Sequence, residues 1–193
     1  MEKNYFHNFM EKLYSYTHDI EATIAGGKPC APEKAFDKAL GAVKDLKKTR
    51  RKAIFIGNGG SAAIASHQAV DYWKNGGIRA VSFNDAAGLT CISNDYGYEY
   101  VFRKPIEMFA EKGDVLFAIS SSGQSPNVLN GVKAAMAKRC FVITLSGFSR
   151  KNALRRMGSV NFYVPSSSYG VIEIAHLAVC HSILDFIIEP RKE

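Results

Sequence analysis

Closely spaced cysteines are missing from this sequence. The four cysteines among its 193 residues, Cys30, Cys91, Cys140 and Cys180, lie far apart and form no Cys-X-X-Cys pair. This excludes a disulfide-stabilised scaffold and argues against a zinc knuckle. Long apolar runs are missing too, because no stretch reaches the roughly 18 apolar residues of a membrane helix and the first residues lack a signal-peptide core. We therefore expect a cytoplasmic protein with no membrane partner.

The composition also lacks the low hydrophobicity and high net charge of disordered chains. Hydrophobic residues make up 47% of the chain and charged residues 22%, enough for one domain with a real core. The net charge of +7 favours an acidic partner, either a small anion or nucleic acid. The densest basic run, at residues 47–52, has no interleaved aromatic residue and no nucleic-acid motif after it. We interpret it as a helix C-terminus, where the helix dipole favours cations, and expect no nucleic-acid partner.

Two parts of the chain differ in their residue patterns. Residues 1–50 carry apolar residues at helical spacing and no strand signal, which predicts two helices separated by the Gly/Pro-rich residues 26–32. From residue 51 on, short runs rich in Val, Ile or Phe alternate with helical patterns. The runs are 53–56, 80–83, 115–119, 141–145 and 161–164, and the helical patterns are 62–73, 98–110, 128–138 and 169–188. This alternation predicts an α/β fold, with a parallel sheet covered by helices on both faces.

A glycine-rich loop follows the first of these runs. Asn58, Gly59, Gly60 and Ser61 stand directly before a helical pattern. Glycines let a ligand approach the backbone, Ser61 can cap the helix, and a helix N-terminus offers unpaired N–H groups to an anion. The loop lacks the third glycine of a dinucleotide-binding motif and the Gly-Lys-Ser/Thr of a P-loop. Taken alone, it fits an anion site and an ordinary tight turn equally well.

Hydroxyl groups crowd the loop after the third run. Ser120, Ser121, Ser122 and Ser125 fall within six residues, and Ser125 followed by proline is typical of a helix start. In a parallel sheet, ligands bind outside the carboxyl ends of the strands. Hydroxyls and unpaired N–H groups at such a place form a phosphate cradle. We favour this interpretation over a polar loop with one capping serine.

A histidine and a carboxylate lie four residues apart on the helix after the glycine loop. His67 and Asp71 therefore share one face, about one turn apart. Such a pair can share a metal or relay a proton, although on an arbitrary helix it is more often a simple hydrogen-bonded pair. Because this helix begins at a ligand loop, we favour a functional pair. His176, on the apolar last helix, is instead expected to be a core residue.

The two loops together, GNGGS at residues 57–61 and SSSGQSPNVL at residues 120–129, resemble the SIS (sugar isomerase) domain, and most of all the bacterial phosphoheptose isomerases. The resemblance extends over nearly the whole chain, including residues 94–98. It implies one three-layer α/β/α domain over residues 1–193 with a five-stranded parallel sheet. Residues 1–50 would form a helical oligomerisation segment and residues 51–193 the phosphosugar-binding core.

The resemblance also implies an activity: aldose–ketose isomerisation of a sugar phosphate through an enediol. The implied conversion is sedoheptulose 7-phosphate to D-glycero-D-manno-heptose 7-phosphate, for surface polysaccharide. The alternative is a non-catalytic SIS module that binds phosphosugars or a replication-initiator protein. Asp71 would remove the proton next to the carbonyl and His181 would return one. The implied substrate contacts are Asn58, Gly59, Gly60, Ser61, Asp71, Asn94, Asp95, Ser120, Ser121, Ser122, Ser125 and Glu173.

One zinc ion per subunit is implied as the cofactor. Its ligands by resemblance are His67, Asp71, Glu173 and His181. Asp71 stands where the family has Glu, and Glu173 stands where it has Gln. Gly170 replaces an acidic residue, and Lys74 or Asn75 stands near the place of an arginine. Phosphate recognition is thus better preserved than recognition of the sugar hydroxyls.

The spacing of two implied ligands bears on assembly. Glu173 and His181 are eight residues apart on one predicted helix, so their Cα atoms are about 12 Å apart. One metal bound by both from a single chain needs both side chains nearly fully stretched, and a site completed by a neighbouring subunit is easier to build. The first helix also carries an apolar face that monomers avoid exposing, formed by Phe6, Phe9, Met10 and Leu13. Together with the resemblance, this predicts a homotetramer with shared active sites.

Overall fold

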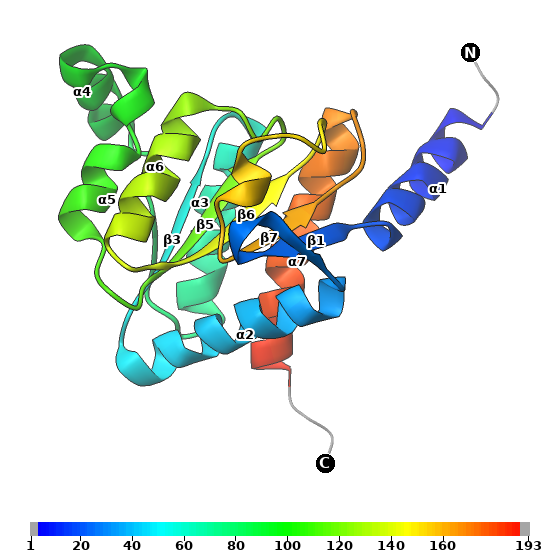
Figure 1. Cartoon of the computed structure of the whole chain (residues 1–193), viewed down its shortest axis with the longest axis horizontal. Coiled ribbons are helices and arrows are strands. Elements are labelled where there is room, and N and C mark those ends of the chain that lie inside the picture. The colour runs from blue at the N-terminus through cyan, green and yellow to red at the C-terminus, as the bar shows by residue number, and fades with distance from the viewer. Residues whose placement is uncertain (1–3, 190–193) are drawn as a thin grey trace.

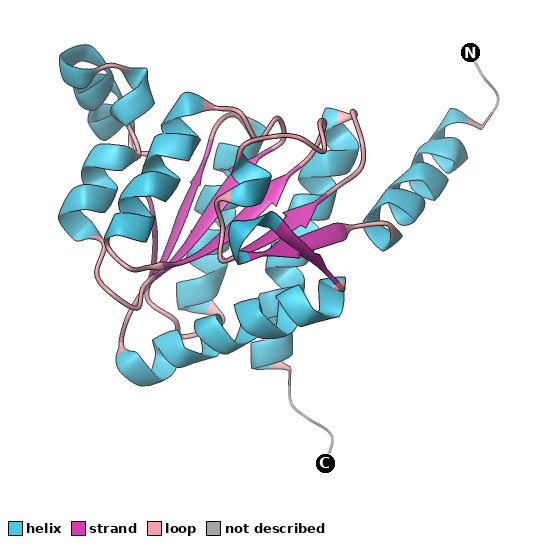
Figure 2. Cartoon of the chain, viewed as in Figure 1, coloured by secondary structure: helices cyan, strands magenta, loops and turns pink. Residues whose placement is uncertain are grey.

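The protein is a three-layer α/β/α structure, seen in a computed structural model that describes residues 4–189 (Figure 1, Figure 2). Its strands are β1 (Glu21–Ile24), β2 (Lys28–Cys30), β3 (Ala53–Gly57), β4 (Ala80–Ser82), β5 (Val115–Ser120), β6 (Phe141–Ser146) and β7 (Val160–Tyr163). Its α-helices are α1 (Tyr5–His18), α2 (Pro32–Thr49), α3 (Gly60–Lys74), α4 (Ala86–Tyr96), α5 (Arg103–Phe109), α6 (Pro126–Ala137) and α7 (Tyr169–Ile188). Short 3₁₀ helices are η1 (Ala25–Gly27), η2 (Tyr98–Tyr100) and η3 (Leu154–Arg156).

The strand order creates one crevice at the edge of the sheet. The order is β2-β1-β7-β6-β5-β3-β4, and the strands from β3 to β7 run parallel. The chain passes from β3 outward to β4 and then returns to β5 on the other side of β3. This reversal is the topological switch point at which open α/β sheets bind ligands. The loops after β3 and β5 therefore face each other across the ligand-binding edge.

The five predicted parallel strands are present, but the sheet has seven strands. The expectation that residues 1–50 hold no strand is therefore wrong. β1 pairs antiparallel with β7, with Ala22 opposite Phe162, and β2 pairs antiparallel with β1. A hydrogen bond from Thr23 Oγ1 to the Arg155 carbonyl (3.0 Å) also holds β1 in place. Because these partners lie far away in the chain, four residues of β1 carry no local period that would reveal a strand.

The segment between β4 and β5 also differs from expectation. The single helix predicted over 98–110 is divided into η2 and α5, and α4 precedes them without having been predicted. Asp85 caps α4, since its Oδ1 accepts a hydrogen bond from Gly88 N at 3.0 Å. No residue of α4 is buried. Leu89 and Ile92 pack against the core but are only partly buried. Two such residues give too weak a helical period to predict the helix.

Two apolar cores lie on the two faces of the sheet. One packs against α2, α3 and α7, and the other against α5 and α6. On the first face, Phe55 of β3 stacks on Phe117 of β5 with ring centroids 4.5 Å apart, and Tyr72 of α3 meets Phe55 edge-on at 5.0 Å. Aromatic contacts of this kind add to the free energy of burial. They fix α3 on the two strands that border the crevice.

α1 and α7 have unusual surfaces. α1 projects away from the sheet (Figure 1). It buries none of its residues and leaves Tyr5, Phe6 and Met10 exposed. α7 is the one helix within residues 4–189 that is long and apolar enough to cross a bilayer by length and composition. A single helix of this kind is weak evidence for a membrane span, since the buried core helices of other proteins have the same length and composition. α7 in fact packs on the sheet and buries Ile172 and Cys180.

Candidate active site

A polar cavity of about 260 Å³ lies at the carboxyl ends of β3 and β5. We call it the anion pocket. The first residues of α3 and the loop leading into α6 both border it, so unpaired backbone N–H groups and the positive ends of two helices favour a bound anion there. Its lining is Asn58, Gly59, Gly60, Ser61, Ser120, Ser121, Ser122, Ser125, Tyr169 and Glu173.

The serines after β5 form a compact cluster. Ser120 Oγ lies 3.4 Å from Ser122 Oγ and 3.3 Å from Ser125 Oγ, so one small anion can contact several hydroxyls at once. The turn depends on Gly123, which has a φ of +61°. A Cβ there would lie 2.2 Å from Asn152 Oδ1. Gly123 thus permits the backbone turn that brings the hydroxyls together.

Asn58 is held by two residues that the sequence analysis missed. Its Nδ2 donates to Asn127 Oδ1 at 2.9 Å, and Asn127 Nδ2 donates back to Asn58 Oδ1 at 2.8 Å. The Tyr98 hydroxyl donates to the same Asn58 oxygen at 3.1 Å. Asn127 stands two residues after Ser125, but its role becomes visible only when β3 and β5 are known to be neighbours.

α7 contributes two side chains to the pocket. The Glu173 carboxylate packs directly against Gly60, where an added Cβ would lie 2.3 Å from Glu173 Oε1. Tyr169, not predicted from the sequence, lines the pocket mouth and meets the Phe148 ring edge-on at 4.9 Å. The available signal was its position, since Tyr169 begins the helix that follows the last parallel strand at the same sheet edge.

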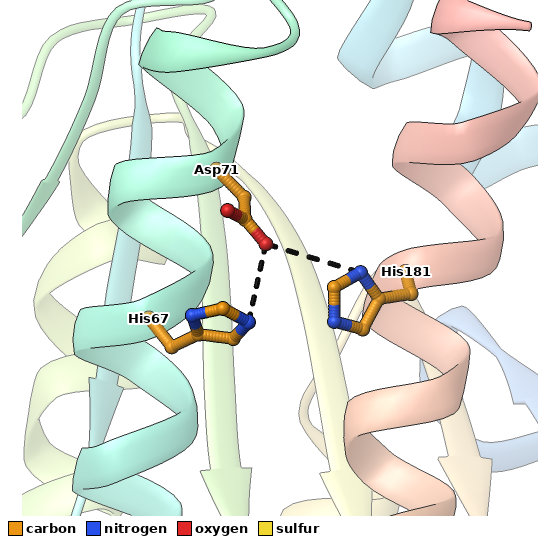
Figure 3. Close-up of side chains that lie close together, drawn as sticks. All are labelled: His67, Asp71 and His181. Carbon is orange, nitrogen blue, oxygen red and sulfur yellow. Dashed lines mark ion pairs between the residues drawn. The ribbon is translucent and has the colours of Figure 1, made fainter.

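A second cluster lies farther along the same two helices. His67 and Asp71 on α3 face His181 on α7, as Figure 3 shows. Asp71 Oδ2 is 3.2 Å from His67 Nε2 and 4.0 Å from His181 Nδ1. One potential ligand atom from each of the three residues lies within 4.8 Å of the others. Two imidazoles and a carboxylate are a donor set that suits zinc.

Three predicted site residues lie apart from the groups expected to hold them. Glu173 is not part of the cluster around Asp71, because it stands two turns before His181, about 12 Å along α7. Asn94, in the last turn of α4, lines a separate hollow with Tyr98 rather than the anion pocket. Its Nδ2 donates to the neighbouring Asp95 Oδ1 at 2.9 Å.

His176 is a core residue, as expected. It is fully buried, and its Nε2 lies 3.2 Å from the Ser146 carbonyl oxygen. Burial lowers the pKa of His176 to about 4, against the opposing effect of that hydrogen bond. The ring is therefore neutral near pH 7 and donates from Nε2. Within residues 4–189 its Nδ1 has no hydrogen-bond partner.

Comparison with known proteins agrees with this geometry. The SIS domain family model matches residues 15–147. Phosphoheptose isomerase from Helicobacter hepaticus is 37% identical over 159 residues, which cover 79% of this chain and 81% of that protein. The solved phosphoheptose isomerase from Neisseria gonorrhoeae has a TM-score of 0.80 at 30% identity, covering 94% of this chain and 95% of that one. That from Francisella tularensis has a TM-score of 0.82 at 25% identity, covering 97% and 98%. The chain therefore belongs to the SIS domain family, on its phosphoheptose isomerase branch.

Proposed function

We propose that this protein is an aldose–ketose isomerase that converts sedoheptulose 7-phosphate into D-glycero-D-manno-heptose 7-phosphate. The observation that carries the proposal is the arrangement of two groups along α3 and α7: the anion pocket and the His67–Asp71–His181 cluster. The names of the relatives support the substrate. A module that only binds phosphosugars needs the pocket but has no use for the cluster.

The phosphate binds in the serine cluster. Ser120, Ser122 and Ser125 supply hydroxyls, and the start of α6 supplies backbone N–H groups and a partial positive charge. Among the described residues that line the pocket, none is a lysine or arginine. Neutral donors therefore hold the phosphate, and the sugar chain extends toward Asn58 and the start of α3.

The reaction moves one proton between two neighbouring carbons. A base takes the proton from C1 of the ketose, the C–H electron pair forms a C1=C2 double bond, and the carbonyl oxygen gains a proton. Return of a proton to C2, with loss of the O1 proton, gives the aldose. The facing helices supply two carboxylates, Asp71 and Glu173, and a histidine, His181, for these transfers.

The cluster fits one zinc ion per subunit. His67, Asp71 and His181 would hold it, since nitrogen and carboxylate oxygen are common zinc ligands and their atoms lie within 4.8 Å of one another. When bound, zinc supplies Lewis-acid polarisation of the sugar oxygens. The side chain of His67 is 53% exposed, so the cluster lies at a surface that a neighbouring subunit can cover. This exposure and the uncovered α1 support a homotetramer with shared active sites, and we propose that it is cytoplasmic.

The direct test is conversion of sedoheptulose 7-phosphate by the full-length protein, followed by NMR in deuterated water. We expect heptose 7-phosphate with solvent deuterium at the reacting carbon. The double change Ser120→Ala and Ser122→Ala should raise KM by about a hundredfold or more, because two hydrogen bonds to a charged group are lost and each is worth about 1.5–3 kcal/mol. Tight binding of the sugar phosphate without any conversion would instead establish a binding module.

A further inference from the structure

The loop after β6 is tied to the loop that carries the serine cluster. Gly147 N donates a hydrogen bond to the Ser121 carbonyl oxygen at 2.9 Å. Asn152 Nδ2 donates to the Gly147 carbonyl oxygen at 3.3 Å. Two residues farther along, Leu154 N donates to the Gly123 carbonyl oxygen at 3.0 Å. The residues that follow β6 are therefore held at a fixed place relative to the proposed phosphate site.

Phe148 has a strained backbone in this loop, with a φ of +52°. Bulky residues rarely adopt this conformation, so the surrounding contacts must hold it. Phe148 N donates to the Ser166 carbonyl oxygen at 3.0 Å, and the Tyr163 hydroxyl donates to the Phe148 carbonyl oxygen at 2.8 Å. The Phe148 side chain packs against the small apolar cluster that includes Ile172 of α7. These contacts fix the Phe148 ring beside the start of α7.

Tyr169 rests on this ring at the mouth of the anion pocket. The rings of Tyr169 and Phe148 meet edge-on, with centroids 4.9 Å apart. Tyr169 stands four residues before Glu173, so both side chains lie on one face of α7, and both line the pocket. Tyr169 is nevertheless 62% exposed. Much of its aromatic surface is thus free to contact a ligand in the pocket.

The chemistry of the Tyr169 ring indicates which part of a phosphosugar it contacts. The face of an aromatic ring is electronegative and disfavours a phosphate, which hydroxyls and helix N-termini bind well. The pocket volume of about 260 Å³ is below the roughly 300–1,000 Å³ of typical ligand sites. A sugar held by its phosphate in the serine cluster therefore extends through the mouth. There the ring meets C–H groups of the sugar, and removing both apolar surfaces from water is favourable.

We propose that Tyr169 is a specificity-determining residue whose ring covers the sugar carbons of a bound phosphosugar, and that Phe148 is the positioning residue that holds this ring. The inference rests on the isomerase function proposed above, which supplies the phosphosugar. The ring contributes to the binding of a sugar phosphate and not to that of inorganic phosphate, which the serine cluster holds alone. Tyr169 thereby favours the sugar phosphate over free phosphate that competes for the same pocket.

The test is calorimetric binding to the full-length protein of two probes, inorganic phosphate and a heptitol 7-phosphate made by borohydride reduction of sedoheptulose 7-phosphate. The heptitol has no carbonyl and cannot isomerise. Tyr169→Ala should weaken heptitol phosphate binding by about tenfold, as expected for the loss of roughly 50 Å² of apolar contact. It should leave phosphate affinity within about threefold, and Tyr169→Phe should leave both affinities within about threefold. KM should rise with the heptitol phosphate Kd, while kcat changes little.

Two further variants test the positioning role and the background effect of losing an exposed ring. Phe148→Gly removes the supporting ring, and glycine accepts the φ of +52°. It should weaken heptitol phosphate binding, and its effect should not add to that of Tyr169→Ala in the double variant. The matched control is Phe109→Ala, because the exposed Phe109 ring rests on Phe83 with centroids 6.1 Å apart and does not line the anion pocket. The control should keep both affinities.

Four results would overturn the assignment. Unchanged heptitol phosphate affinity in Tyr169→Ala would show that the ring does not contact the sugar. An equal loss for both probes would show damage to the whole pocket. Additive effects in the double variant would remove the positioning role of Phe148. A smaller assembly of Tyr169→Ala in light scattering would make the ring a subunit contact. A parent protein that binds heptitol phosphate but converts no sugar phosphate would refute only the proposed function, so the two failures are distinguishable.

Discussion

Replacing Gly60 by alanine should lower the isomerase activity while the free energy of unfolding stays nearly unchanged. Gly60 is the first residue of α3, and its added Cβ would lie 2.3 Å from Oε1, 2.4 Å from Cδ and 2.5 Å from Oε2 of Glu173. No real Cβ makes contacts this short, so the carboxylate must move. Gly60 is not among the glycines with positive φ, and its backbone therefore accepts alanine. The perturbation thus acts on the position of one carboxylate.

The expected magnitudes follow from these contacts. Alanine is favoured over glycine in a helix by up to about 1 kcal/mol, and the Glu173 side chain can swing toward the pocket at small cost. The free energy of unfolding should therefore change by less than about 1 kcal/mol in either direction. A misplacement of about 1 Å in a catalytic group can lower the rate about 10²-fold. We expect a loss of that order in kcat.

The assay pairs urea unfolding with isomerase kinetics on Gly60→Ala and on a control, Gly41→Ala. Gly41 lies on the exposed face of α2, and nothing lies within 4 Å of an added Cβ. The control should gain about 0.5–1 kcal/mol of stability and keep full activity. Full activity in Gly60→Ala would refute the need for the carboxylate at its observed place. Unfolding of Gly60→Ala under native conditions would refute the claim that the Glu173 side chain can move away from the added Cβ at a small cost in free energy.

Three further outcomes test other parts of the structure. Asp114→Ala should lower the free energy of unfolding by about 3–5 kcal/mol, because the fully buried Asp114 carboxylate pairs with Lys52 Nζ at 2.7 Å. An unchanged midpoint of urea unfolding would contradict this. His176 has a folded pKa of about 4, below its unfolded value, so the stability linked to its neutral form is present above about pH 6.5 and is lost as the pH falls toward 4. The loss should reach on the order of 3 kcal/mol and be missing in the pH series of His176→Asn. Elemental analysis should find about one divalent ion per subunit in the parent and none in the double variant His67→Ala and His181→Ala, and a metal-free parent would sink the zinc proposal.

The parallel core of the fold was predictable because its strands are buried on both faces. β3, β5 and β6 read as short apolar runs, and the glycine and serine loops at their carboxyl ends mark the ligand edge. β1 and β2 were not predictable, since they form by pairing at the far edge, next to β7. α4 was missed because none of its residues is fully buried and only Leu89 and Ile92 among the described residues of this helix pack partly against the core. Local pattern thus reports elements that bury a face and misses those formed by distant pairing.

In the candidate site, too, local spacing predicted some contacts, whereas others depend on which strands are neighbours in the sheet. Spacing alone placed His67 and Asp71 together, and the structure confirms that they are neighbours at 3.2 Å. The position of Tyr169 at the pocket mouth and the pairing of Asn58 with Asn127 depend on which strands are adjacent. Strand order is a property of the whole fold, so no single loop motif contains it.

Because Glu173 and His181 lie two turns apart on α7, the pair of helices α3 and α7 holds two separate groups: the contact of Glu173 with Gly60 at the anion pocket, and the His67–Asp71–His181 cluster. α7 runs beside α3 in the same direction, since Glu173 meets Gly60 at the start of α3 and His181 meets Asp71 more than two turns later. Glu173 and His181 are about two turns or 12 Å apart on α7, and Gly60 and Asp71 are about three turns or 16 Å apart on α3, so the two contacts lie well apart along the helix pair. Any residue that replaced Gly60 would close the contact at the pocket end and leave the cluster at the other end untouched. Metal content should therefore survive changes at Gly60 that lower kcat, which a single merged site would not permit.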